Sequence, residues 1–326
     1  MNLLPILACL ISALSDDTLL GPRTRTVFAA VSEAGLRGEH QRADSIARGW
    51  ESAREPEGQL LRATAALASF SDIHDPADLR TARASLDRLE KQLADRTDPR
   101  SRLLLAMGKS QESYLASLEG RSLASALAGR SAASIAQGLL DGGHVVPEAQ
   151  GIVGGYLFWK SQSVGSVGRF FAGDQRARGV ALSQVAAEAR SPFREAFRTS
   201  LLWIRFEQGD FAEALKIARS ARADWPQDRP YHQAEGDVLF RMGRHQDALD
   251  VYRSSFLEYR GVEVLPVNRM AAAGNLARIH ASMGRTDSAR AWLDTLDAPR
   301  YREVRKWLPP SLVRELEPVR RELARK

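Results

Sequence analysis

The sequence predicts an all-α protein, a solenoid of about seven antiparallel helix pairs with a C-terminal capping helix. Two observations support this fold class. A glycine followed five positions later by an alanine recurs four times between helical patterns, and no stretch alternates apolar and polar residues between turn signals as a strand would. Recurrence of one unit is typical of stacked helical hairpins, because each hairpin buries its apolar face only against a neighbour.

The recurring motif is a glycine–alanine pair that occurs four times, as Gly38 and Ala43, Gly209 and Ala214, Gly243 and Ala248, and Gly284 and Ala289. The glycine allows a left-handed stop between two helices, and the alanine allows the helices to approach closely. Successive glycines are 34 residues apart from Gly209 to Gly243 and 41 apart from Gly243 to Gly284, so seven extra residues fall around Gly261.

Prolines justify the expected helix starts in order along the chain, because a helix start tolerates proline and a helix interior does not. In the first half, Pro56, Pro76, Pro99 and Pro147 mark joints between the helices of four pairs: residues 22–37 with 39–54, 57–71 with 76–95, 100–119 with 121–140, and 147–172 with 174–190. In the second half, Pro192, Pro226, Pro230 and Pro299 mark joints in or beside three pairs: residues 192–208 with 210–225, 230–242 with 244–259, and 267–283 with 285–297.

An amphipathic capping helix is expected after Pro309 and Pro310. Its spacing turns five apolar residues inward, namely Leu312, Val313, Leu316, Val319 and Leu323. Pro318 should kink or split this helix.

Residues 192–298 resemble the tetratricopeptide repeat (TPR) family. Counted from Arg229, the family's small, glycine, alanine, aromatic and small positions are Gly236, Gly243, Ala248, Tyr252 and Ser255. Similar matches start at Glu195 and Met270, and a less complete one covers residues 24–57. The resemblance implies that the pairs stack into a right-handed superhelical solenoid.

The chain therefore divides into five segments. They are a secretory signal peptide at residues 1–15, N-terminal TPR-like helical repeats at 16–145, a degenerate helix pair rich in glycine and aromatic residues at 146–190, three TPR repeats at 191–298, and a basic capping helix at 299–326.

Residues 3–14 form an uncharged apolar stretch, and Ala13 and Ser15 are small residues at the positions that a signal peptidase reads. We expect the signal to be cleaved and the protein to be extracytoplasmic, periplasmic or secreted, in a bacterium. The alternative is lipoprotein anchoring at Cys9, because residues 6–9 resemble a lipobox. A transmembrane span is not expected, since it needs about 20 apolar residues.

Charge is concentrated at the C-terminus. Residues 299–326 contain nine basic and four acidic residues, whereas the rest of the chain is nearly neutral. A neutral body argues against nucleic acid as a partner, because tracking a phosphate backbone needs a basic stripe. The tail is either a solvated cap or a site of peripheral association with a membrane or an envelope complex.

Some short segments resemble motifs for catalysis, cofactor binding or metal binding, but their surroundings do not fit these functions. Residues 108–110 (GKS) and Ser166 in VGSVG resemble parts of a phosphate-binding loop and a nucleophile elbow, but neither follows a strand. Asp72, His74 and Asp75 are interpreted as a polar helix start and not as metal ligands. We predict no catalytic residue, no cofactor, no metal and no enzymatic activity.

The segment 138–173 is dense in glycine, which disfavours helix. One explanation is close helix packing, with aromatic side chains in the core. The other is a pocket around residues 150–171 with Tyr156, Trp159, Lys160 and Arg169 exposed, which would make the chain a small-molecule or glycan binder, and even an enzyme.

The TPR resemblance implies that the first helix of each pair lines a concave groove. The residues expected there are Thr199, Trp203, Phe206, Glu207, Gln233, Asp237, Phe240, Arg241, Arg278 and Ser282, with Asn275 nearest to the family's carboxylate clamp. This mixture of polar and aromatic side chains suits a protein or peptide partner, either an extended peptide or a helix. The alternative is that Trp203 and Phe206 belong to the interhelical core. The favoured function is an exported, non-catalytic scaffold in a bacterial envelope complex.

Overall fold

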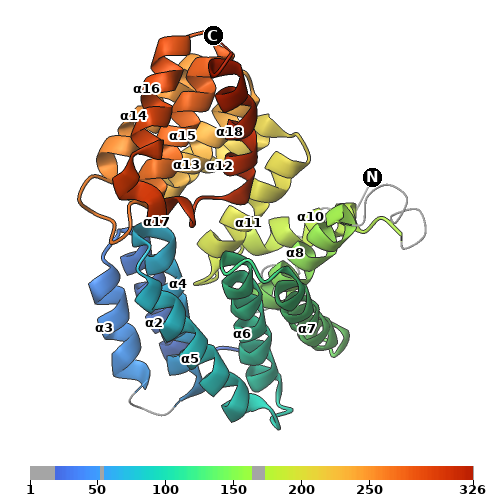
Figure 1. The fold of residues 1–326 in the computed structure, drawn as a ribbon. Coiled ribbons are helices and arrows are strands. Elements are labelled where there is room, and N and C mark those ends of the chain that lie inside the picture. The colour runs from blue at the N-terminus through green and yellow to red at the C-terminus, as the bar shows by residue number, and fades with distance from the viewer. Residues whose placement is uncertain (1–18, 52–54, 164–172, 326) are drawn as a thin grey trace. The chain divides into compact units, whose positions relative to one another are not determined.

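The computed structural model describes residues 19–51, 55–163 and 173–325, and every regular element in this part of the chain is a helix (Figure 1). The elements are α2 (Pro22–Leu36), α3 (His40–Glu51), α4 (Pro56–Ile73), α5 (Pro76–Leu93), α6 (Pro99–Leu118), α7 (Ser122–Asp141), α8 (Pro147–Ser163), α10 (Arg176–Glu188), α11 (Arg194–Glu207), α12 (Phe211–Asp224), α13 (Arg229–Arg241), α14 (His245–Glu258), α15 (Val267–Ser282), α16 (Thr286–Asp297), the 3₁₀ helix η1 (Pro299–Tyr301), α17 (Arg302–Arg305) and α18 (Pro310–Leu323).

These elements confirm the predicted all-α fold and its helix pairs. The expected ends that fall on described residues agree with the structure to within three residues, and in the fourth pair α8 is described as far as Ser163. The remainder of that expected helix, residues 164–172, lies outside the described residues. The right-handed superhelix stays a prediction.

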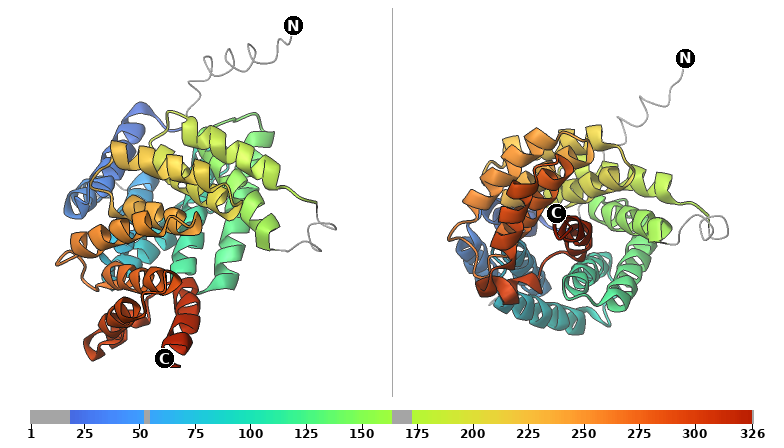
Figure 2. Two further views of the ribbon diagram at one scale, coloured as in Figure 1. Left: turned by 90° about the horizontal axis from the view of Figure 1, so that it is seen from above. Right: turned by 45° about the horizontal axis from the view of Figure 1, so that its top comes forward.

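The chain forms two compact units. The described residues of the first unit fall within 19–32, 45–64 and 83–201, and those of the second within 33–44, 65–82 and 202–325. In the first unit α6 pairs with α7, α8 pairs with α10, and α7 also packs on α8. In the second unit each helix from α12 to α16 packs against the next, and α18 covers α15 (Figure 2).

The turn glycines have the left-handed backbone that the sequence predicts. Gly38, Gly209, Gly243 and Gly284 have φ between +71° and +79°. In each turn the next residue donates its N–H to a carbonyl five positions back, as Arg244 does to Leu239 at 3.0 Å. This arrangement satisfies carbonyls that a helix end otherwise leaves unpaired. The matching alanines, Ala43, Ala214, Ala248 and Ala289, are at most 1% exposed.

The C-terminal cap differs from its prediction in three respects. Residues 299–326 begin with η1 and the short α17, so the segment is not one helix. The expected split at Pro318 was wrong, because α18 continues through this exposed residue. Val313 is 36% exposed instead of inward, since it lies about 100° around the helix from Leu312. Leu312, Leu316 and Leu323 are buried as expected.

Candidate functional site

The first helices of three consecutive pairs, α11, α13 and α15, share one register relative to their turn glycines. Three positions before the glycine, α11 and α13 carry Phe206 and Phe240. Six positions before it, the three helices carry Trp203, Asp237 and Arg278. Because Ala214, Ala248 and Ala289 hold each second helix tightly against its partner, the same face of each first helix is left for these residues.

Aromatic rings form one end of this face. The ring centroids of Trp203 and Phe206 are 5.4 Å apart in an edge-to-face arrangement, and Phe206 lies 5.5 Å from Phe211. Phe206 and Phe240 pack on the buried core around Leu239, and they and Trp203 are only half-buried. These rings therefore belong partly to the interhelical core and partly to the surface.

Two arginines stack on phenylalanines of the preceding pair. The Arg241 guanidinium carbon lies 5.5 Å from the centroid of Phe206, and that of Arg278 lies 4.0 Å from the centroid of Phe240. A guanidinium over an aromatic face is attracted by the ring quadrupole. The two stacks therefore join α13 to α11 and α15 to α13.

A chain of charged contacts continues from Asp237 to the cap. The Tyr252 hydroxyl donates to Asp237 Oδ1 at 2.5 Å, and Arg278 lies 3.9 Å from the same oxygen. Arg278 also forms an ion pair with Glu315 of α18. Burial raises the pKa of Asp237 above its usual range, although the Tyr252 hydrogen bond and the two arginines oppose this shift. We call Trp203, Phe206, Asp237, Phe240, Arg241 and Arg278 the first-helix face.

The other predicted groove residues do not join this chain of contacts. Thr199 Oγ1 donates to the Glu195 carbonyl of its own helix at 2.9 Å. Gln233 Nε2 donates to the Asn268 carbonyl at 3.4 Å. Asn275 is 9% exposed, so it is buried within the packing of α15.

The comparisons with known proteins agree with the repeat fold. The tetratricopeptide repeat family model matches residues 199–256 and 233–301. Residues 199–301 are tetratricopeptide repeats. Among solved structures, NprR in complex with its cognate peptide NprX has a similar fold, with 14% sequence identity and a TM-score of 0.50 over 92% of this chain and 83% of that one. No curated protein sequence matches the chain.

The seven extra residues between the last two TPR repeats lie in the loop between α14 and α15, and this loop contacts the C-terminal end of α4. The Val264 N–H donates to the Ile73 carbonyl at 2.8 Å. Asn268 Nδ2 lies 3.0 Å from the carbonyls of both Ser71 and Asp72. These contacts satisfy carbonyls that the end of α4 leaves without helical partners.

Asp72 is the centre of a buried ionic cluster that sequence reasoning missed. Arg229 donates to both oxygens of its carboxylate, and His40 Nε2 lies 2.7 Å from Oδ2. Burial favours the neutral acid, but the hydrogen bonds from His40 and Arg229 outweigh it and lower the pKa of Asp72. The interpretation of residues 72–75 as a helix start holds only for Asp75, whose carboxylate accepts the Ala77 N–H at 2.9 Å.

Glu263 and His74 complete this cluster. Glu263 accepts the N–H groups of Asn268 at 2.6 Å and Arg269 at 3.0 Å, at the start of α15. Burial raises the pKa of Glu263 to about 8 and lowers the pKa of His74 to about 4. No group of His, Cys, Asp and Glu side chains in the described ranges could hold a metal. The contacts of the cluster join residues 65–82 to the TPR repeats within the second unit.

Close packing explains Gly154 of α8 and Gly179 of α10. A Cβ on Gly154 would lie 2.7 Å from the Ser183 backbone nitrogen and 2.8 Å from the Gly179 carbonyl oxygen. Of the residues proposed for a pocket, Tyr156 is half-buried, Trp159 and Lys160 are exposed, and Arg169 lies outside the described residues. Lys160 Nζ lies 5.8 Å from the Tyr156 ring centroid.

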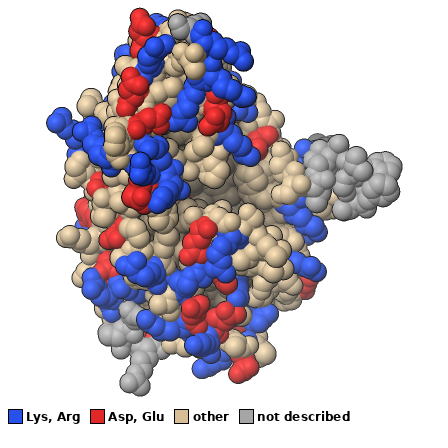
Figure 3. All heavy atoms as spheres, in the orientation of Figure 1, with Lys and Arg blue, Asp and Glu red and all other residues tan. Residues whose placement is uncertain are grey.

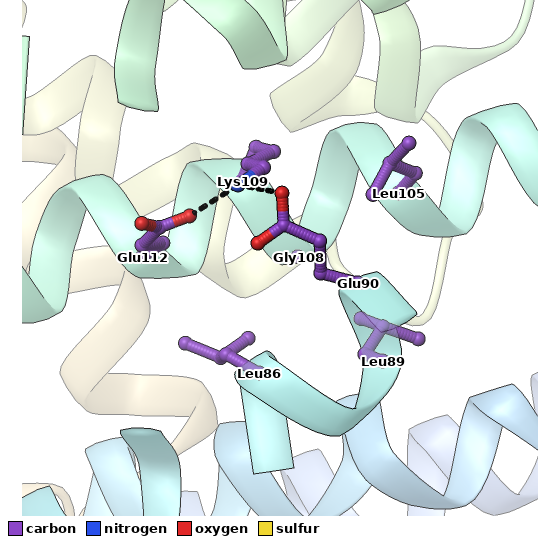
Figure 4. Close-up of a pocket in the computed structure, with 7 residues that line it drawn as sticks. All are labelled: Leu86, Leu89, Glu90, Leu105, Gly108, Lys109 and Glu112. Carbon is purple, nitrogen blue, oxygen red and sulfur yellow. Dashed lines mark hydrogen bonds and ion pairs between the residues drawn. The ribbon is translucent and has the colours of Figure 1, made fainter. Parts of the chain in front are cut away.

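A small cavity between α5 and α6 surrounds Lys109 (Figure 4). Its volume of about 10 Å³ has room for about one water molecule. Lys109 lies inside α6 and pairs with Glu90 at 2.6 Å and Glu112 at 2.8 Å. These ion pairs leave the lysine of the GKS sequence engaged with carboxylates, in a helix instead of a phosphate-binding loop.

Basic side chains are numerous over α17 and α18 on the face shown in Figure 3. Arg302 of α17 and Arg314 and Arg321 of α18 are exposed. No helix of the described residues is both long and apolar enough to cross a bilayer.

Proposed function

We propose that the chain is a non-catalytic scaffold whose first-helix face binds a segment of a partner protein, as an extended peptide or a helix. One observation carries this proposal: the half-buried rings of Trp203, Phe206 and Phe240 and the exposed Arg241 lie on one contiguous face across consecutive TPR repeats. Aromatic side chains and arginine are the residues that most often anchor protein interfaces.

The similarity to NprR, which was solved with a cognate peptide, supports a peptide ligand. The contacts of the groups whose pKa values are strongly shifted support the absence of catalysis. Asp72 and Arg229 bind each other, Asp237 binds Tyr252, and Glu263 caps α15. Each of these pKa shifts therefore arises in a structural contact and not in a reactive group that faces a cleft.

Affinity purification from the native cell envelope fraction, followed by mass spectrometry, tests the proposal. The wild-type chain should recover a reproducible protein partner, and Trp203→Ala combined with Phe206→Ala should lose it. Leu257→Ala is the matched control, because Leu257 is 63% exposed on the second helix α14. Recovery of a bound metabolite without any protein would instead favour the small-molecule or glycan alternative.

Export to the envelope is part of the same proposal. It is supported by the apolar stretch of residues 3–14 and the small residues that follow it. Cell fractionation with N-terminal sequencing should find the mature chain outside the cytoplasm, beginning near Asp16. A lipid-modified Cys9 would support lipoprotein anchoring instead, and an intact Met1 in the cytosol would contradict export.

A further inference from the structure

We infer that the bound segment carries a carboxylate side chain that pairs with Arg241, beside an apolar side chain that rests on Trp203 and Phe206. The inference rests on the proposed function and specifies the chemistry of the partner.

Both arginines of the first-helix face lie over a phenylalanine of the preceding pair, at 5.5 Å for Arg241 and 4.0 Å for Arg278, but their ionic partners differ. Arg241 covers Phe206 and Arg278 covers Phe240, and each phenylalanine stands three positions before its turn glycine. Arg278 is engaged by carboxylates of the protein itself, namely Asp237 at 3.9 Å and Glu315 of the cap. Arg278 therefore shows that an arginine packed on a phenylalanine of this face can pair with a carboxylate from the neighbouring element, here Glu315 of α18.

Arg241 lies over the Phe206 ring without an ion pair. Among the described residues no carboxylate oxygen lies within 4.0 Å of its guanidinium, and its side chain is exposed. The nearest acid on the face, Asp237, already accepts the Tyr252 hydroxyl. Contact with the Phe206 ring restrains the Arg241 guanidinium, and its N–H donors remain available to a carboxylate from outside.

The neighbouring charges limit how acidic the segment is. Glu207, at the equivalent position of α11, is also exposed and forms no ion pair within the described ranges. A run of acidic residues would place like charges beside Glu207, which is unfavourable. The segment therefore carries a local acidic residue at Arg241 next to an apolar residue, and it is not a polyanion.

A random peptide library displayed on phage and selected on the full chain tests this inference. Peptides enriched on the wild type should share an acidic residue adjacent to an apolar one. Arg241→Glu should reverse the enrichment toward Lys and Arg at that position. The matched control Arg244→Glu changes net charge equally, but Arg244 lies in the turn and pairs with Asp247, so it should keep the wild-type consensus.

A double-mutant cycle on one selected peptide then measures the coupling between its acidic residue and Arg241. Replacing its acidic residue by the amide should weaken binding to the wild type by tenfold or more, and binding to Arg241→Ala by less than twofold. Peptides that bind through Trp203 and Phe206 but lack a common acidic residue would overturn the inference and leave the proposed function standing. Failure to enrich any peptide, or binding that survives loss of both aromatic rings, would overturn the proposed function and the inference with it.

Discussion

The guanidinium of Arg229 donates hydrogen bonds to both carboxylate oxygens of Asp72, which lies 157 residues earlier in the chain. Both side chains are largely buried, at 18% and 7% exposure. The pair fixes the C-terminal end of α4 against the start of α13, next to the Tyr259 ring, whose centroid is 5.4 Å from the guanidinium carbon. The compact second unit therefore depends on a contact that no local pattern contains.

Removing the charge of Asp72 should destabilise this junction strongly. Asp72→Asn leaves Arg229 buried without its counter-ion, so we expect the free energy of unfolding to fall by about 3 kcal/mol. Urea denaturation measures the change. Glu213→Gln is the matched control, since Glu213 pairs with Lys216 in an exposed contact that contributes less than about 1 kcal/mol. Equal losses in the two variants would contradict the importance of the buried pair.

The free energy of unfolding should show a plateau as a function of pH and should decrease on both sides of it, because of the groups in this cluster. Glu263, with its pKa raised to about 8, binds its proton more tightly in the folded state, so stability decreases as pH rises from 4.5 to 8. His74, with its pKa lowered to about 4, makes stability decrease as pH falls from 6.5 to 4. Asp72, with its lowered pKa, adds a loss below about pH 4.

The effects of Glu263 and His74 oppose each other between pH 4.5 and 6.5, where we expect the plateau. Only the Glu263 effect remains above this range, so Glu263→Gln should remove the decline from pH 6.5 to 8. Urea denaturation across this range checks the prediction. A decline that persists unchanged in the variant would show that another group causes it.

Glycine substitutions test the turns separately from the packing. Gly243 has φ +73° and no atom within 4 Å of an added Cβ, so Gly243→Ala should cost about 1 kcal/mol through backbone strain alone. Gly138 has the same open space inside α7, and Gly138→Ala should instead stabilise by about 0.5–1 kcal/mol. Opposite signs in thermal melts are expected. A stabilising Gly243→Ala would contradict the left-handed turn.

Two adjacent glycines test the close packing of α8 on α10. Gly154→Ala would push backbone atoms that lie less than 3 Å from the new Cβ, so we expect a loss of about 1–3 kcal/mol. Gly155→Ala meets only Ser200 Oγ at 3.8 Å and should be neutral or stabilising. Similar melting temperatures for the two variants would argue that the helices are not in tight contact.

An alanine substitution tests the register of the TPR repeats. Ala248 is fully buried between α13 and α14, so Ala248→Phe should lower stability by about 1–3 kcal/mol through overpacking. The exposed Ala212 in α12 is the control, and Ala212→Phe should change the melting temperature little. An unchanged melt for Ala248→Phe would contradict the assigned register.

Local signals account for what the sequence predicted correctly. Proline starts, turn glycines and small buried alanines located the helix pairs, because each acts within a few residues of its position. The same logic predicted a split in α18 that does not occur. Pro318 lies on its exposed side, where water can satisfy the freed carbonyl and no packed neighbour is displaced.

The ionic cluster could not be predicted in the same way. Its sequence signals were the polar residues at 71–75 and the seven extra residues before α15, but nothing in the sequence pairs Asp72 with Arg229 or Ile73 with Val264. On the first-helix face, the family register placed Trp203, Phe206, Phe240 and Arg278. The partner of Arg278 came from the cap, whose position no repeat pattern specifies.

Isothermal titration of one selected peptide against matched variants tests the central claim most directly. If the first-helix face binds the partner, Phe206→Ala should weaken affinity by tenfold or more, as loss of a central aromatic anchor does. Leu257→Ala, on the exposed side of α14, should leave it within twofold. Equal affinity for Phe206→Ala and the wild type, with both proteins folded, would contradict the claim.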